Sequence, residues 1–388
     1  MDFDFTEEQV MLRNVARELL AEKCTTRQVR QLMDAPVGSR WDRALWQQLA
    51  EVGLLGVIID DQYGGQGLGM VEQAIVLEEV GRAVMPGPYL ATLLATAAIN
   101  AGGDRGQMAS YLPKIASGQL RATVAAPEER LSWHPDGIAL RAQPQGGDYR
   151  LSGRKLFVPW AKAADLIIVA ARTRDSGDPE RGITLFAVES EAPGLTITPN
   201  EGIDQTSKTG TVDLDNVGVG RESIVGRLDA GAEILRAVLQ RAAVGAAAEM
   251  LGAARKSMEM SVEYARVRRQ FGQPIGAFQA VKHMCAEMLM DVENAHAATY
   301  YAAWALDADA PDATFAASVA KSFVGEAARR VCGTSIQVHG GIGFTWDYDL
   351  HLYFKRAKHL EALFGDAELH RELALREVQA PVAVPVLA

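Results

Sequence analysis

The chain has 388 residues, of which 48% are hydrophobic and 23% charged, so it is long enough for two or three well-cored domains. Its formal net charge of −10 argues against a nucleic-acid-binding surface, which needs clustered lysines and arginines to neutralise phosphates. Three widely spaced cysteines indicate free thiols and no zinc or other metal site. Because the sequence shows no secretion signal and no apolar run long enough to span a bilayer, we expect a cytoplasmic protein with no membrane partner.

The first 120 residues have a helical pattern. Apolar residues recur every three or four positions after Thr6, a residue type that favours a helix N-cap. Further helices are predicted at about 43–53, 72–84, 89–102 and 107–117. A glycine-dense loop, 61–70, follows the first of these. We therefore expect residues 1–120 to form an N-terminal α-helical domain.

The composition changes at about Arg121. Short runs typical of β-strands follow one another to about residue 220, separated by clusters of Gly, Pro, Asp and Asn. The polar segment 175–181 is predicted to be the tip of a hairpin. Residues 121–228 are therefore expected to form a middle β domain, a small barrel or sandwich.

Helical periodicity returns after Gly231. Four long helices are predicted at about 230–268, 276–307, 311–337 and 347–377, each longer than the globular average of about 12 residues. Helices of this length and apolar character form bundles, so residues 229–388 are expected to be a C-terminal four-helix bundle. The tail 380–388 contains two prolines and is expected to be irregular. The predicted fold class of the whole chain is α+β multidomain.

A basic turn lies between the first two helices of this bundle. Gly272 and Pro274 force the turn, and arginines precede it. Arginine forks match diphosphate oxygens, an aromatic ring can lie against a base, and amides can bond to ribose or adenine. The residues with this chemistry are Arg266, Arg268, Arg269, Gln270, Phe271 and Gln279. Taken alone, these residues are more simply explained as a solvated helix end.

The segment 268–279 is similar to the flavin-binding signature R-x-Q-F-G-x-P-I-x-x-F-Q of the acyl-CoA dehydrogenase family, and every named position matches. The family's Y-G-G-x-G appears at 63–67 and its Q-x-x-G-G-x-G-F at 337–344. The order of helical, β and helical domains also resembles the family over the whole chain. The resemblance implies FAD as cofactor. The residues that it assigns to the diphosphate and adenosine half of FAD are Arg268, Gln270, Phe271, Gln279, Gln337, Gly340 and Gly341.

The resemblance also implies a reaction and partners. In the family, a carboxylate removes the α-proton of an acyl-CoA while the β-hydride goes to the flavin, and an electron-transfer flavoprotein reoxidises the flavin. The residues of the two glycine-containing signatures usually serve the flavin of a neighbouring subunit. An assembly of at least two chains is therefore expected.

Three positions depart from the family pattern. The catalytic glutamate falls on Phe364, and the alternative base position on the preceding long helix falls on Ala242. The flavin-lining loop T-E-P-x-x-G-S-D is replaced by the unrelated segment 124–136. In place of the W-I-T-N motif the chain has 157–160, with Pro159 where the flavin-contacting hydroxyl would be. All three losses concern the flavin site that a subunit builds for itself.

This asymmetry resembles the base-lacking subunit of heteromeric α2β2 acyl-CoA dehydrogenases of bacterial sterol side-chain degradation. We therefore expect a non-identical partner subunit that supplies the base, and a bulky acyl-CoA such as a steroid side-chain thioester as substrate. Two alternatives remain open from the sequence. The chain could be a self-sufficient homotetrameric dehydrogenase with a displaced base, Glu361 or Asp366, or a non-catalytic scaffold subunit. For both carboxylates, and for Glu249, a structural or solvated role is the simpler expectation.

Overall fold

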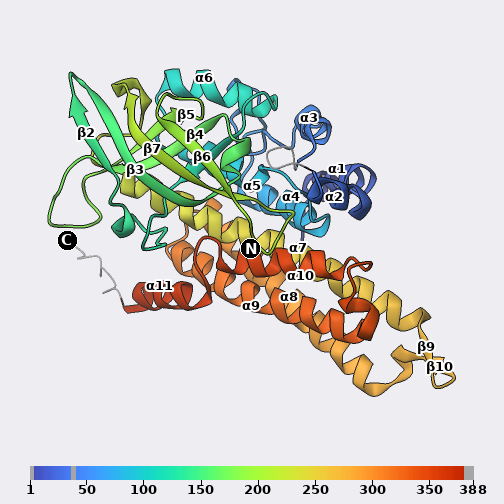
Figure 1. The fold of residues 1–388 in the computed structure, drawn as a ribbon. Coiled ribbons are helices and arrows are strands. Elements are labelled where there is room, and N and C mark those ends of the chain that lie inside the picture. The colour runs from blue at the N-terminus through green and yellow to red at the C-terminus, as the bar shows by residue number, and fades with distance from the viewer. Residues whose placement is uncertain (1–3, 36–40, 380–388) are drawn as a thin grey trace.

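A computed structural model describes residues 4–35 and 41–379, and it places a helical region, a β-sheet and a long helical bundle in succession along the chain (Figure 1). The predicted irregular tail, 380–388, lies outside the described residues. None of the helices within the described ranges combines the length and apolar character needed to cross a membrane. The three cysteines are free thiols, as predicted.

Six α-helices form the N-terminal region as far as the structure describes it. They are α1 (Glu7–Lys23), α2 (Thr26–Met33), α3 (Arg43–Glu51), α4 (Met70–Arg82), α5 (Tyr89–Gly102) and α6 (Arg105–Ala116). Thr6 caps α1 as predicted, because its hydroxyl accepts a hydrogen bond from the backbone N–H of Gln9. The predicted glycine-dense loop is also confirmed. A Cβ on Gly65 would lie 2.0 Å from the carbonyl oxygen of Ile59, so the packing of this chain alone requires that glycine.

The middle of the chain forms one mixed, eight-stranded sheet. Its strands are β1 (Ala122–Ala125), β2 (Arg141–Gln145), β3 (Asp148–Pro159), β4 (Leu166–Arg172), β5 (Ile183–Glu189), β6 (Leu195–Asn200), β7 (Thr209–Val219) and β8 (Ile224–Val225). The order is β6-β7-β3-β2-β4-β5-β8, with β1 parallel to β4. The predicted hairpin tip at 175–181 joins the antiparallel pair β4 and β5.

Alternate residues of this sheet enter two different cores. Val169 and Phe186 belong to a small core formed by residues of the middle region alone. Ile168 and Leu185 pack into the large core that also contains the helices. This period of two explains why both faces of β4 are buried. The sheet is thereby fixed against the helical bundle on one side.

The C-terminal region is a bundle of long helices, α7 (Gly231–Val267), α8 (Gln279–Asp307), α9 (Ala313–His339), α10 (Leu350–Ala362) and α11 (Ala367–Gln379). The first three predicted helices are confirmed within three residues at each end. The fourth prediction, one helix over 347–377, is wrong because the chain breaks between α10 and α11. Phe364 has φ = 65° and Gly365 has φ = 99°, values that end a right-handed helix.

Helices α4 and α7 approach closely through glycine. A Cβ on Gly252 of α7 would lie 1.8 Å from the carbonyl oxygen of Glu78 on α4, and one on Gly81 of α4 would lie 1.9 Å from the carbonyl oxygen of Glu249. These two glycines therefore allow α7 to contact the N-terminal helix α4 closely. This contact fixes the N-terminal region against the bundle.

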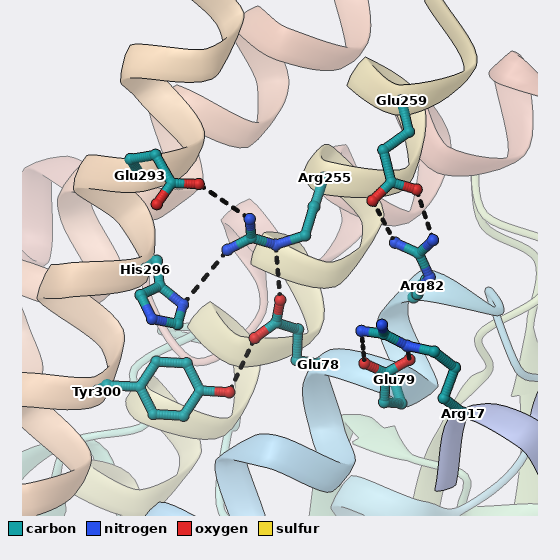
Figure 2. A network of polar contacts seen from close by, with 9 residues as sticks. All are labelled: Arg17, Glu78, Glu79, Arg82, Arg255, Glu259, Glu293, His296 and Tyr300. Carbon is teal, nitrogen blue, oxygen red and sulfur yellow. Dashed lines mark hydrogen bonds and ion pairs between the residues drawn. The ribbon is translucent and has the colours of Figure 1, made fainter. Parts of the chain in front are cut away.

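A network of ion pairs reinforces the same junction (Figure 2). Arg255 of α7 donates from Nε to Glu78 of α4 at 2.9 Å and from Nη1 to Glu293 of α8 at 3.0 Å. Tyr300 of α8 donates its hydroxyl to the other oxygen of Glu78 at 2.8 Å. Two further pairs, Arg17 with Glu79 and Arg82 with Glu259, complete the network. The buried carboxylate of Glu78 is thus fully paired.

Replacement of Arg255 by methionine is expected to lower the free energy of unfolding by about 2–4 kcal/mol, because Glu78 would keep its burial and lose its cation. The control is Arg330→Met, which removes a more exposed pair with Asp291 and should cost less than about 1 kcal/mol. Urea unfolding followed by circular dichroism measures both changes. Equal losses of unfolding free energy in the two variants would show that the network stabilises the protein no more than an exposed ion pair does.

Candidate functional site

The position to which the family resemblance assigns the catalytic glutamate is occupied by a buried aromatic residue. Phe364 is 3% exposed and lies in the break between α10 and α11. Its ring packs on that of Trp133, with centroids 4.7 Å apart and an angle of 57° between the planes. Neither ring can take a proton from a substrate.

The space around this aromatic pair is closed. Phe364, Ala242 and Pro159 line one void of about 10 Å³, and Trp133 lines it too. A second void of about 20 Å³ adjoins Phe364 on the side of Trp160. Each void has room for about one water molecule at most. The three sequence departures, far apart along the chain, therefore meet at one place and fill it.

Trp133 is a residue whose role sequence reasoning missed. It lies in segment 124–136, the loop that replaces the family's flavin-lining motif, and it is 7% exposed. Strand β1 is held beside the same void, because Thr123 donates its hydroxyl to the carbonyl of Pro159 at 2.6 Å. The only sequence signal was the divergence of the loop itself.

A buried arginine cluster forms another wall. Arg356 of α10 is 2% exposed and donates to Asp204 at 2.8 Å, to Glu249 at 3.2 Å and to the hydroxyl of Thr206 at 2.7 Å. It also donates to two backbone carbonyls that follow α4. One guanidinium thus joins the N-terminal helices, the middle region and the bundle beside the void of about 20 Å³.

Burial and charge shift the two carboxyl groups of this cluster differently. Burial raises the pKa of Glu249 to about 7, although Arg356 opposes the shift. Burial also acts to raise the pKa of Asp204, but Arg356 beside it holds that pKa below its usual value. Glu249 lines the same small void as Phe364, yet that void has no room for an acyl chain. The cluster is best explained as an ionic junction between three parts of the chain.

The two carboxylates considered as displaced bases have structural partners. Glu361 accepts from Arg329 at 3.1 Å and from Lys358 at 2.7 Å. Asp366 is exposed and accepts from the backbone N–H of Leu369 at 3.0 Å, as the N-cap of α11. Neither lines the voids around Phe364. These contacts argue against either carboxylate as the base.

Two buried side chains hold the backbone of the break at Phe364. Lys321 of α9 donates to the carbonyls of Glu361 at 2.9 Å and Gly365 at 2.6 Å, and burial lowers its pKa to about 7. His370 of α11 makes a 3.0 Å hydrogen bond from Nε2 to the carbonyl of Phe364. Burial, with a smaller contribution from Lys321, lowers the pKa of His370 to about 4. His370 is therefore neutral at pH 7 and donates through Nε2.

His370 is expected to make stability fall on acidification. Below its usual pKa of 6.5 the unfolded chain binds a proton that the folded chain does not bind until about pH 4, so the unfolding free energy falls over that interval. Between pH 6.5 and pH 5 the loss should be about 1.5 kcal/mol. His370→Gln should remove this component, whereas His283→Gln at an exposed position should not. Urea midpoints at both pH values test this, and equal slopes in all three proteins would contradict it.

The residues assigned to the adenosine half of FAD lie at the far end of the bundle (Figure 1). Arg268 caps α7, and β9 (Arg269–Gln270) and β10 (Gln273–Pro274) form a hairpin whose tip includes Phe271. Phe271 is 91% exposed with φ = 52°. Gln279 begins α8. Arg268, Gln270 and Gln279 are exposed as well.

The second glycine signature ends α9 at the same end of the bundle. His339 stacks on Tyr264 of α7 with centroids 4.3 Å apart, and the carbonyl of Tyr264 accepts from the N–H of Arg268. His339 also bonds through Nδ1 to the carbonyl of Ser335 at 2.8 Å. This hydrogen bond gives His339 a structural role at the end of α9. Gln337, Gly340 and Gly341, also exposed, are thereby brought near the hairpin.

The glycines of this signature have different roles. Gly340 has φ = 64°, which favours glycine, and Gly343 is required because a Cβ would lie 2.8 Å from the Cβ of His339. A Cβ on Gly341 would meet nothing within 4 Å. No contact within residues 4–35 and 41–379 explains the glycine at 341, so the space beside it is available to a ligand or another chain.

FAD fits one of these two places and not the other. Within residues 4–35 and 41–379, the side chains of Arg268, Gln279 and Gln337 have no hydrogen-bond or ion-pair partner, and a diphosphate and adenosine would use such groups. Around Phe364 and Pro159, by contrast, the voids are too small for a flavin ring. The exposed end of the bundle therefore has the groups that the diphosphate and adenosine part of a flavin would need.

Comparisons with known proteins agree along the whole chain. Three family models match in succession: the acyl-CoA dehydrogenase N-terminal domain at residues 6–119, the middle domain at 126–217 and the C-terminal domain at 229–379. Acyl-CoA dehydrogenase FadE27 of Mycobacterium tuberculosis is 30% identical, with 96% of this chain and 99% of that protein covered.

Two solved structures are similar over nearly their full lengths. The ChsE4–ChsE5 complex from Mycobacterium tuberculosis has a TM-score of 0.89 at 30% identity, covering 99% of this chain and 100% of that one. A variant of the Tcur3481–Tcur3483 steroid ACAD has a TM-score of 0.86 at 33% identity, covering 96% and 98%.

Proposed function

Because the chain belongs to the acyl-CoA dehydrogenase family of FAD-dependent oxidoreductases, we propose that it is the base-lacking subunit of a heteromeric dehydrogenase. One observation carries the proposal. Phe364 and Trp133 fill the family's base position and leave voids of only about 10 and 20 Å³ around it, while the groups for the adenosine end of FAD are exposed. The chain therefore has a filled base position of its own and exposed groups that can contact the FAD of a neighbouring subunit.

In this proposal, Arg268 binds the FAD diphosphate with its guanidinium fork. Phe271 and the amides of Gln270 and Gln279 bind the adenosine, and the backbone at 340–341 allows close approach. Bound FAD supplies the acceptor for the hydride. The partner subunit contributes the glutamate that takes the α-proton, together with the flavin-facing middle domain. This chain therefore completes a site without touching the reacting carbons.

A bulky acyl-CoA, such as a steroid side-chain thioester, is the proposed substrate. Support comes from the similarity to the steroid ACAD Tcur3481–Tcur3483 and from the ChsE4–ChsE5 complex, which joins two different chains. An electron-transfer flavoprotein is the proposed acceptor of the electrons from reduced flavin. A homotetramer with Glu361 or Asp366 as base is less well supported, because both carboxylates have structural partners.

The test is to purify the chain alone and together with a family member that carries glutamate at the position of Phe364, beginning with the product of the neighbouring gene. Steroid acyl-CoA and a dye acceptor would be supplied to both preparations. We expect turnover only in the mixed assembly. Turnover by this chain alone, with full flavin content, would overturn the proposal.

A further inference from the structure

A cavity of about 280 Å³ lies between α7, α9 and α11. Helix α11 lines it over about two turns, because His370, Leu373 and Glu377 follow one another at spacings of three and four residues and so share one face of the helix. Glu377 is exposed, and α11 ends only two residues later, at Gln379. The chain therefore leaves α11 at the rim of the cavity, and the segment that follows is held next to the opening.

The wall of the cavity is largely apolar and contains a buried acceptor without a donor. Leu239, Ala243 and Ala317 supply apolar surface from α7 and α9. His370 is 5% exposed, and because its Nε2 donates to the carbonyl of Phe364, its Nδ1 is an acceptor. That Nδ1 has no hydrogen-bond partner in the described part of the chain. A buried polar atom of this kind favours an occupant that brings an N–H group to it.

The charged residues of the lining favour an uncharged occupant. Arg236 is paired with Glu180, and Arg376 is paired with Glu372 at 2.6 Å, so both arginines already have an anionic partner. Gln240 donates its amide N–H to a threonine of α9 at 2.7 Å, which leaves its amide oxygen as a second acceptor. Apolar surface combined with two acceptors suits an apolar peptide segment, whose backbone supplies N–H groups, better than it suits an anion.

The segment that follows α11 has this character. Residues 380–388, outside the described ranges, have the sequence APVAVPVLA, without any polar or charged side chain. Pro381 favours a change of direction after the helix, because proline cannot continue helical hydrogen bonding. An extended chain of this length spans up to about 30 Å, whereas His370 lies only about 14 Å back along α11 from its last residue. The segment is therefore long enough to reach His370.

We propose that the segment 380–388 turns back beside α11 and closes this cavity. Alternate side chains of an extended chain point to the same side, so Val382, Val384 and Val386 together meet the apolar wall in this arrangement. A backbone N–H of the segment donates to Nδ1 of His370. The cavity is slightly smaller than the roughly 300 Å³ of the smallest ligand sites, so it takes part of the segment and not all of it.

Attachment to α11 gives this segment an advantage over any free ligand. A group joined to its site by a short linker acts at an effective concentration on the order of millimolar. The segment therefore keeps other apolar molecules out of the cavity and joins the end of α11 to α7 and α9. This inference rests on the cavity and the sequence after α11, and it is independent of the proposed heteromeric assembly.

Amide hydrogen exchange of the full chain in its natural assembly, followed by mass spectrometry, tests the inference. We expect the amides of 380–388 to exchange at least tenfold more slowly than those of the free peptide APVAVPVLA. Leu373→Trp fills the cavity and should abolish this protection. Leu375→Trp on the same helix, at a position 53% exposed and outside the lining, is the matched control and should keep it.

A second variant changes the segment and leaves the cavity intact. Replacing Val382, Val384 and Val386 by aspartate should release the segment, because three carboxylates will not enter an apolar cavity. Its amides should then exchange within twofold of the rate of a free peptide with the same substitutions.

Exchange of the unaltered segment at the rate of its free peptide would overturn the inference, as would equal protection in Leu373→Trp and Leu375→Trp. Protection that survives both Leu373→Trp and the aspartate substitutions would also overturn it, because a partner subunit would then cover the segment. Flavin content and turnover, measured in the same samples, test the proposed function separately.

Discussion

Replacing Arg356 with methionine is expected to lower the free energy of unfolding by about 3–5 kcal/mol, because Asp204 and Glu249 would be left as buried carboxylates without their cation. The guanidinium also bonds to carbonyls after α4, so its loss loosens contacts of three parts of the chain at once. Chemical denaturation at pH 7.5 measures the change.

Two further variants make this experiment specific. Arg154→Met removes an exposed pair with Asp213 and should cost less than about 1 kcal/mol. Adding Glu249→Gln to Arg356→Met removes one of the stranded charges and should restore part of the lost stability. A small cost for Arg356→Met, similar to that of Arg154→Met, would show that solvent reaches the cluster in the assembled protein.

Arg268→Ala is expected to weaken FAD binding by the mixed assembly by about 10- to 100-fold, because a charge-assisted contact to the diphosphate contributes about 1.5–3 kcal/mol. Turnover should fall with flavin occupancy and return when FAD is added in excess. The matched control is Arg266→Ala, an exposed arginine of α7 outside the flavin signature, which should keep its flavin. Gel filtration followed by flavin absorbance measures the difference.

This prediction also separates a shared flavin site from a scaffold role. If Arg268→Ala and Arg266→Ala both retain FAD and activity, the chain does not contact the cofactor, and the scaffold alternative is favoured. If both lose the partner subunit, the hairpin acts in assembly and not in flavin binding. The proposed function requires flavin loss with the assembly intact.

Much of the fold could be predicted because its signals are local. The cap at Thr6, the glycine loop near Gly65 and the long apolar helices follow from residues within a few positions of each other. The break at Phe364 could not, since apolar periodicity runs through it and a phenylalanine rarely has positive φ. Contacts of this residue with Trp133, and of its backbone with His370, accompany that conformation.

The site was predictable only where a motif marks it. The family signatures located Phe364, Ala242 and Pro159, and the structure brings these three together. No local pattern distinguishes Arg356 from the other basic residues of α10, because its partner Asp204 is 152 positions away. Trp133 is likewise hidden in a divergent loop. The filling of the space around Phe364 depends on contacts between distant segments, which sequence periodicity does not encode.

The number of FAD molecules per polypeptide in the purified assembly is the most direct test of the account. Flavin released by denaturation would be counted against total protein, with the two kinds of chain quantified separately. We expect about one FAD for every two chains, because the voids beside Phe364 leave no room for a flavin and the proposed partner would supply the flavin-facing site. One FAD for each copy of this chain in an assembly that contains no other chain would contradict it.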